Sequence, residues 1–167
     1  PDGAGNNQYG DPVTTTLSVP DLGTISSIIV NVDVSHTYIQ DLQIALFHPD
    51  LETYAVLWQR SCDGEDGIDV TFSDGANAIE CANPTVGTFA PFEALSIFEG
   101  MTSEGEWVLY ARDGYNQDSG VINDWSIEIC SELALSVDDN SNLLENISVY
   151  PNPSSGIFNV KLNSFIN

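Results

Sequence analysis

Short segments in which apolar and polar residues alternate recur along the chain, and they constrain its fold more than any other feature. In residues 30–35, three valines alternate with Asn, Asp and Ser. A period of two residues is typical of a half-buried β-strand, and no helical period competes with it. Similar segments occur at residues 42–46, 54–58, 68–72, 107–111 and 125–129. The sequence therefore predicts an all-β fold.

Turn-forming residue pairs separate these segments. Asp-Gly pairs occur at residues 63–64, 66–67, 74–75 and 113–114, and a Pro-Asp pair at 49–50. Gly, Asn and Asp tolerate the positive φ values that tight turns require. Many short strands joined by such turns are typical of an antiparallel β-sandwich.

The composition changes along the chain and predicts its organisation. Residues 1–16 are rich in Gly, Asn and Asp, so we interpret them as a linker. The predicted sandwich covers residues 17–131, and the polar residues 132–146 are interpreted as an acidic linker. Residues 147–167 contain another strand-like segment, which is too short to form a core of its own. With no long apolar run and no signal peptide, we expect no membrane insertion and a chain that begins inside a longer protein.

The charge of the chain excludes two classes of partner. Its 25 Asp and Glu residues against 3 Lys and Arg give a formal net charge of −22. Nucleic acids and anionic membranes bind proteins through Lys and Arg, so neither is expected to bind here. The chain is 42% hydrophobic, which is enough to bury a core.

Several motifs resemble those of one known family, and they follow one another in the family's order. Residues 36–42, HTYIQDL, resemble the HTY-x-x-DL signature of the P domain, also called the Homo B domain, of proprotein convertases and many bacterial secreted proteases. Residues 69–76 resemble its TFDD-like run, and residues 88–100 follow. Residues 105–127 are similar to its GxWxL…D…G…W ending. Together the resemblance covers residues 15–131.

This resemblance implies a fold and a function. The fold would be a jelly-roll sandwich like that of galactose-binding domains. The function would be that of a non-catalytic accessory domain, which stabilises or assists the catalytic domain of a secreted, proteolytic parent. That peptidase, of serine or metallo type, would precede this chain in the same polypeptide. The alternative function is a jelly-roll module that binds carbohydrate, protein or a cell surface.

Catalysis by the chain itself is disfavoured. It contains two histidines, His36 and His48, but no GxSxG or HExxH motif. A sugar-stacking role for the tryptophans is disfavoured too. Trp107 and Trp125 are in phase with apolar residues two positions further on, which predicts that both belong to the core.

A second resemblance lies near the end of the chain. Residues 149–160, VYPNPSSGIFNV, resemble the start of the C-terminal sorting domain recognised by the type IX secretion system. Only the first strands of such a domain are present in residues 147–167. The resemblance implies a bacterial protein that the type IX machinery exports across the outer membrane, to be secreted or held at the cell surface.

Acidic residues crowd two predicted loops and raise the question of a metal. Four fall within residues 63–69 and others within residues 113–124. Oxygen ligands in flexible loops suit Ca²⁺, whereas the alternative is a solvated acidic surface. Neither cluster fits the EF-hand pattern. The family resemblance favours Asp41, Asp74 and Asp113 as calcium ligands, because they match recurrent acidic positions in a family of which some members carry structural calcium.

The three cysteines, Cys62, Cys81 and Cys130, lack the spacing of a zinc site. Bacterial P domains that resemble this chain commonly carry a cysteine pair at the first two positions, so the resemblance implies a disulfide between Cys62 and Cys81. Cys130 is then either buried in the last strand of the sandwich or paired with a residue outside this chain.

Overall fold

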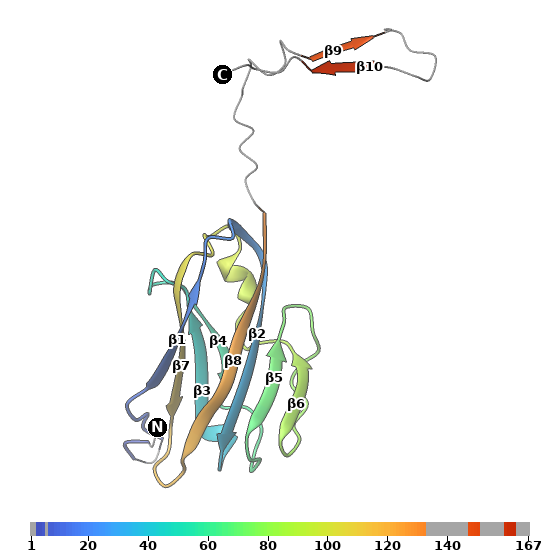
Figure 1. Cartoon of the computed structure of the whole chain (residues 1–167). Coiled ribbons are helices and arrows are strands. Elements are labelled where there is room, and N and C mark those ends of the chain that lie inside the picture. The colour runs from blue at the N-terminus through green and yellow to red at the C-terminus, as the bar shows by residue number, and fades with distance from the viewer. Residues whose placement is uncertain (1–2, 6, 133–146, 151–158, 163–167) are drawn as a thin grey trace. The chain divides into compact units, whose positions relative to one another are not determined.

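The structure, a computed structural model, describes residues 3–5, 7–132, 147–150 and 159–162 (Figure 1). The chain divides into two units, Pro1–Ala134 and Leu135–Asn167.

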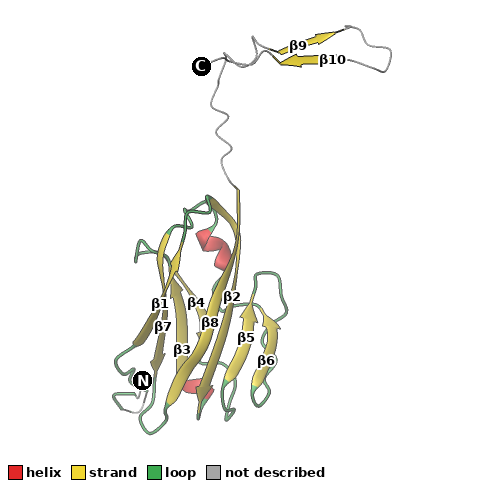
Figure 2. Cartoon of the chain, viewed as in Figure 1, coloured by secondary structure: helices red, strands yellow, loops and turns green. Residues whose placement is uncertain are grey.

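Two four-stranded sheets make up the described part of the first unit (Figure 2). The order of the first sheet is β1 (Val13–Val19), β7 (Gly105–Asp113), β3 (Leu42–Phe47) and β4 (Tyr54–Gln59). The order of the second is β6 (Thr85–Phe89), β5 (Ile68–Phe72), β2 (Thr24–His36) and β8 (Gly120–Glu132). Two short 3-10 helices, η1 (Ile39–Asp41) and η2 (Leu95–Phe98), lie in the connections. The predicted all-β sandwich is confirmed.

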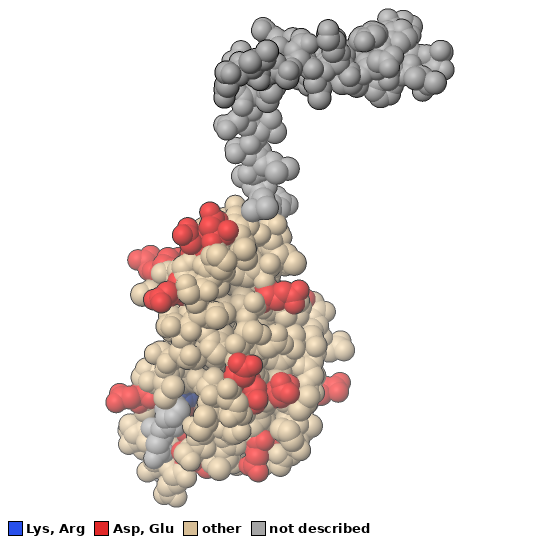
Figure 3. All heavy atoms as spheres, viewed as in Figure 1, with Lys and Arg blue, Asp and Glu red and all other residues tan. Residues whose placement is uncertain are grey.

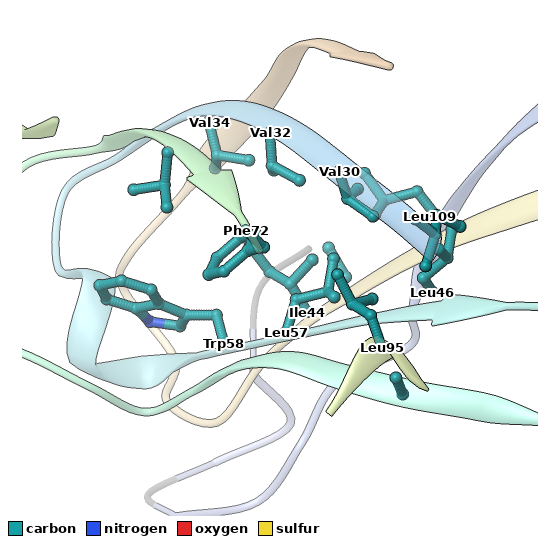
Figure 4. Close-up of a cluster of buried hydrophobic side chains, with 14 of the residues drawn as sticks. Val30, Val32, Val34, Ile44, Leu46, Leu57, Trp58, Phe72, Leu95 and Leu109 are labelled. Atoms are coloured by element: carbon teal, nitrogen blue, oxygen red, sulfur yellow. The ribbon is translucent and has the colours of Figure 1, made fainter. Parts of the chain in front are cut away.

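The core lies between the two sheets, because the inward-facing residues of each strand are apolar. Val30, Val32 and Val34 of β2 alternate with more exposed polar residues, as predicted, and are at most 4% exposed. Figure 4 shows them in one cluster with residues of the opposite sheet and of η2, namely Ile44, Leu46, Leu57, Trp58, Leu95 and Leu109. Burial of this apolar surface is the main force that holds the sheets together.

The sandwich begins earlier than the sequence indicated. β1 starts at Val13, inside residues 1–16, which the sequence analysis assigned to a linker. It pairs with β7, and the Gly3 amide donates to the Tyr115 carbonyl over 2.8 Å. Three consecutive threonines inside β1 hide the apolar alternation, although β-branched residues suit strands well.

One strand pair departs from the antiparallel arrangement that the sequence predicts. β6 pairs with β5 in parallel, from Ile68 opposite Thr85 to Phe72 opposite Phe89. The other strand pairs of the two sheets are antiparallel. The segment between β5 and β6 returns the chain to the end of the sheet where β5 began, and this requires a crossover instead of a hairpin.

The cysteines are arranged as the family resemblance implies. Cys62 and Cys81 form a disulfide, with their Cα atoms 5.4 Å apart. Cys130 is a free cysteine on β8 and is exposed. The expectation that Cys130 could be buried is therefore wrong, because it lies at an outward position of the strand, next to the half-buried Ile129.

The described part of the second unit is a pair of strands. β9 (Ile147–Tyr150) pairs antiparallel with β10 (Asn159–Leu162). Most of the motif that resembles a sorting domain, residues 151–158, lies outside the described residues, as do residues 133–146 of the predicted acidic linker. In the described residues, no helix is long and apolar enough to cross a membrane.

Acidic side chains are spread over the face of the first unit that Figure 3 shows. The described part of the sandwich contains two arginines, and both have partners. Arg60 lies 3.6 Å from Asp41, and Arg112 packs 3.8 Å from the ring centroid of Tyr9. Within the described sandwich, only these two arginines offset the negative charge of the acidic side chains.

Candidate functional site

The residues of the family signature build a buried polar cluster at the point where the two sheets meet. His36 ends β2 in one sheet, and Asp113 ends β7 in the other. The His36 Nε2 atom lies 3.0 Å from Asp113 Oδ2, and both side chains are at most 1% exposed. On the other side of the ring, His36 Nδ1 lies 3.0 Å from the Tyr38 carbonyl oxygen and 3.1 Å from the Tyr38 amide nitrogen. The hydrogen bond between His36 and Asp113 joins the two sheets directly.

Asp113 is held on its other side by backbone groups. Its Oδ1 atom accepts a hydrogen bond of 2.8 Å from the Tyr115 amide. The Gly114 amide donates to the carbonyl of Asp41, and the Gly10 amide to the carbonyl of Asp113. Both carboxylate oxygens are thus paired, as a fully buried aspartate requires. The pairing fixes the turn after β7 and the segment before β1.

Asp41 and Arg60 complete the cluster. Asp41 Oδ1 lies 3.6 Å from an Arg60 guanidinium nitrogen. Burial raises the pKa of Asp41, the nearby Asp113 raises it further, and Arg60 opposes both effects. Arg60 also donates to the Gln40 carbonyl over 3.3 Å. We call His36, Asp41, Arg60 and Asp113 the signature cluster.

Next to the signature cluster lies a polar hollow of about 560 Å³. It is lined by Tyr38, Gln40, Asp41, Arg60, Tyr115 and Asp118. The Tyr38 hydroxyl donates to Asp63, and this hydrogen bond raises the pKa of Tyr38 above its ordinary value. The sequence analysis did not single out Arg60. The sequence did contain a signal for it: the chain has only 3 Lys and Arg, so an arginine among 25 acidic residues is expected to pair with one of them.

The signature cluster lacks the arrangement of a nucleophilic enzyme. Both ring nitrogens of His36 are engaged, one by Asp113 and the other by the backbone of Tyr38. In the described residues, no serine or cysteine is hydrogen-bonded to His36, as a nucleophile activated by a histidine base would be. The geometry is that of a structural connection between sheets.

The three predicted calcium ligands do not form one site. Asp41 and Asp113 belong to the signature cluster, whereas both oxygens of Asp74 accept hydrogen bonds of 2.8 Å from the Leu95 and Ser96 amides of η2. Both oxygens of Asp113 accept hydrogen bonds, and one oxygen of Asp41 lies 3.6 Å from the Arg60 guanidinium. In the described part of the chain, no group of three acidic, His or Cys side chains is arranged for a metal.

One further carboxylate oxygen stands out. Among the buried side-chain nitrogen and oxygen atoms of the described residues, Glu65 Oε2 is the one that lacks a hydrogen-bond partner. It belongs to none of the three predicted ligands. The role of Asp41, Asp74 and Asp113 as calcium ligands stays a prediction; in the structure Asp74 accepts hydrogen bonds from η2, and Asp41 and Asp113 belong to the signature cluster.

The tryptophans occupy different environments. Trp58 and Trp107 are 0% exposed, which confirms the core position predicted for Trp107. Trp125 on β8 is half-buried, and its Nε1 atom donates to Thr15 of β1 over 3.4 Å. Trp125 also lines a second hollow, of about 470 Å³, between these two edge strands. Trp125 therefore packs against the core, as predicted, but is only partly buried.

Comparison with known families decides what the sandwich is. A family described as the proprotein convertase P-domain matches residues 25–129. The chain belongs to this family. The match contains the whole signature cluster, from His36 to Asp113, so the buried connection described above is built by P-domain residues. The P domain is a non-catalytic accessory domain of proteases, which agrees with the structural use of His36.

Two curated relatives are named as proteases. The P domain is 30% identical over 117 residues to proteins named calcium-dependent protease from Trichormus variabilis and from a Nostoc species. The matched part is 68% of this chain and 15% of each relative. The chain therefore spans a small part of the length of these proteases.

A solved structure is also similar. It contains the Aeromonas sobria serine protease in complex with a chaperone, and it matches 80% of this chain and 25% of the matched chain. The sequence identity is 14% and the TM-score is 0.47.

Proposed function

We propose that this P domain is the accessory domain of a protease within the same polypeptide, and that it packs against the catalytic domain and stabilises it. The observation that carries the proposal is the family match over residues 25–129. The relatives are named proteases, and the catalytic domain would be of serine or metallo type. The sandwich supports the role because its own core and signature cluster hold its two sheets together.

The stabilisation has a simple thermodynamic basis. A domain that binds only the folded form of its neighbour shifts that neighbour's unfolding equilibrium toward the folded state. When both domains are in one chain, the effective concentration is high, so even a weak interface stabilises the neighbour.

The test compares the catalytic domain of the parent protein with and without this chain. We expect the half-life of peptidase activity at raised temperature to lengthen when the chain is supplied. Bovine serum albumin at the same concentration controls for non-specific protection. An unchanged half-life at saturating chain would contradict the proposal.

A second candidate function rests on the hollow beside Trp125. The half-buried Trp125 lines this hollow together with Asn123 and Asp124, and an indole beside amide and carboxylate groups suits a sugar. A glycan array probed with the chain tests this alternative. Binding that Trp125→Ala abolishes would favour a carbohydrate-binding module over the accessory role.

We further propose that residues 147–167 belong to a sorting domain through which the type IX secretion machinery exports a bacterial protein across the outer membrane. The support is the sequence motif, which lies largely outside the described residues. The test is deletion of the protein from residue 147 onward in the native host. Retention of the deleted form inside the cell is expected, and unimpaired export would contradict the proposal.

Calcium is suggested by the acidic loops, by the family resemblance and by the names of the relatives. The matched part is 15% of each relative, so residues outside it can account for the calcium dependence that the names of those proteases state. The accessory role proposed here does not depend on a calcium ion shared by Asp41, Asp74 and Asp113.

A further inference from the structure

A groove lies between the start of β4 and helix η2, apart from the signature cluster. Its volume is about 820 Å³, and its lining includes Glu52, Tyr54, Glu93, Ala94, Ile97 and Met101. Figure 1 shows the loop between β3 and β4 and the helix η2 toward the same end of the sandwich. We call this feature the β4–η2 groove.

Exposed apolar side chains concentrate around this groove. Tyr54 and Ile97, which line it, are 46% and 53% exposed. Leu51 and Phe92, each next in sequence to a lining residue, are 64% and 61% exposed. These are four of the seven large apolar residues that are exposed in the described part of the chain. Exposed apolar residues that gather in one region of a surface mark an interaction site more often than scattered single residues do.

The loop that carries Leu51 is rigid. Both carboxylate oxygens of Asp50 accept hydrogen bonds of 2.9 Å, from the amides of Glu52 and Thr53 and from the Thr53 hydroxyl. Leu51 itself has a φ of 59°, in the left-handed region that disfavours leucine. Leu51 is therefore exposed in a backbone conformation that costs a leucine free energy, and its side chain contributes little to the core.

The other side of the groove is equally fixed. The Phe92 amide donates to the Leu57 carbonyl over 3.0 Å, and the Glu93 amide to the Val56 carbonyl over 2.8 Å. The Glu93 side chain accepts a hydrogen bond of 2.8 Å from the Val56 amide. The segment therefore covers the free edge of β4 and holds Phe92 in place. A preformed apolar surface binds with a smaller entropy cost than a flexible one.

The charge at the groove defines what it can bind. Glu52 and Glu93 both line it, and the two arginines of the described sandwich are engaged elsewhere, with Asp41 and with Tyr9. The rim is thus acidic without a neighbouring cation. A partner must supply the positive charge, and anionic partners such as acidic membranes are repelled.

We propose that the β4–η2 groove is the surface on which the P domain docks a folded protein that presents an apolar side chain flanked by Lys or Arg. This inference rests on the proposed accessory function, since it takes the catalytic domain of the parent protein as that partner. It adds the place and the chemistry of the contact.

The test measures binding of the chain to the separately produced catalytic domain by titration calorimetry. Leu51→Asp and Ile97→Asp change the groove, and we expect each to weaken binding at least tenfold, as hot-spot substitutions do. Matched controls are Val86→Asp and Val121→Asp, which are 58% and 63% exposed on β6 and β8. These controls should bind as the unchanged chain does. Leu51→Asp is expected to fold, because aspartate tolerates the left-handed conformation better than leucine.

The charge component is tested with a third variant. Glu52→Lys should weaken binding and reduce its dependence on salt, because it replaces an attractive contact with a repulsive one. This variant lies on an exposed loop, so it keeps the test valid if Ile97→Asp does not fold.

The outcomes separate this inference from the function on which it rests. If the unchanged chain binds the catalytic domain and the groove variants bind equally well, the groove is not the docking surface, while the accessory function stands. Self-association of the chain that the groove variants abolish would assign the groove to a second copy and overturn the proposal. Absence of any binding by the unchanged chain would overturn both.

Discussion

His36 and Asp113 have an importance at the residue scale that their positions in sequence do not show. They are 77 positions apart, yet one hydrogen bond of 3.0 Å between them connects the two sheets. The family resemblance favours Asp113 as a calcium ligand, and in the structure its buried carboxylate pairs with an imidazole and a backbone amide. Sequence could not show this, because spatial pairing across sheets depends on the register of both strands.

Removal of the Asp113 carboxylate should destabilise the domain strongly. Asp113→Ala leaves His36 Nε2 and the Tyr115 amide without their partner in a buried place. We expect the free energy of unfolding to fall by about 3 kcal/mol, the order found for breaking a buried pair. Urea denaturation measures the change. Asp124→Ala, on the exposed face of β8, is the control and should change stability by less than about 0.5 kcal/mol.

Asp50 gives a prediction for the pH dependence of stability. Hydrogen bonds from the backbone of Thr53, together with those from Glu52 and the Thr53 hydroxyl, lower the pKa of Asp50 to about 2. A carboxyl whose pKa is lower in the folded state stabilises the fold when ionised. Its contribution is fully present above about pH 4 and is lost as the pH falls through about 2.

The comparison of the unchanged chain with Asp50→Asn isolates this contribution. The difference in free energy of unfolding between the two should be constant near pH 5 and should shrink as the pH falls toward about 2. Urea titrations at several pH values measure it. A difference that grows on acidification would show that the Asp50 carboxylate does not stabilise the β3–β4 loop in its ionised form.

At the scale of elements, most of the strands that the sequence predicted show clear alternation, whereas β4 is buried at four successive residues. β2, β3, β5 and β7 each place apolar residues on one face, and each has its inward residues buried. β1 and β6 were not predicted, because one contains three threonines in a row and the other is the short segment TVGTF with Gly87 at its centre. Their strand conformation depends on the neighbours with which they pair, which a local pattern does not contain.

The Cys62–Cys81 disulfide adds a covalent link near the paired strands β5 and β6. It closes a loop with a sequence separation of 19 around β5, ahead of the parallel strand β6. In the chain-entropy account, a loop of this length contributes roughly 3 kcal/mol by restricting the unfolded chain. Replacement of both cysteines by alanine should therefore lower the free energy of unfolding by about that amount.

The control for the disulfide is already in the chain. Cys130→Ala removes an exposed free thiol and should leave stability nearly unchanged. Urea denaturation of the double variant, the Cys130 variant and the unchanged chain under non-reducing conditions gives the comparison. Equal midpoints for all three would show that the disulfide contributes nothing to the stability of the sandwich.

At the scale of the whole molecule, the excess of acidic residues sets the response to ions. With a formal net charge of −22, the carboxylates repel one another in the folded state more than in the expanded chain. Salt screens this repulsion, so the thermal midpoint should rise with ionic strength. The effect requires no specific site, and any divalent cation should produce it.

Calcium and magnesium at equal concentration therefore distinguish screening from a specific site. Because Asp41, Asp74 and Asp113 have other partners, we expect the same thermal midpoint in about 2 mM CaCl₂ and about 2 mM MgCl₂ at one ionic strength. Differential scanning calorimetry measures both, with a chelator as the reference. A midpoint several degrees higher in calcium would show that the P domain binds this ion through other oxygen atoms, since a ligand that binds only the folded state must raise stability. Glu65→Gln would then be the first variant to examine, because its buried Oε2 lacks a hydrogen-bond partner within the described residues.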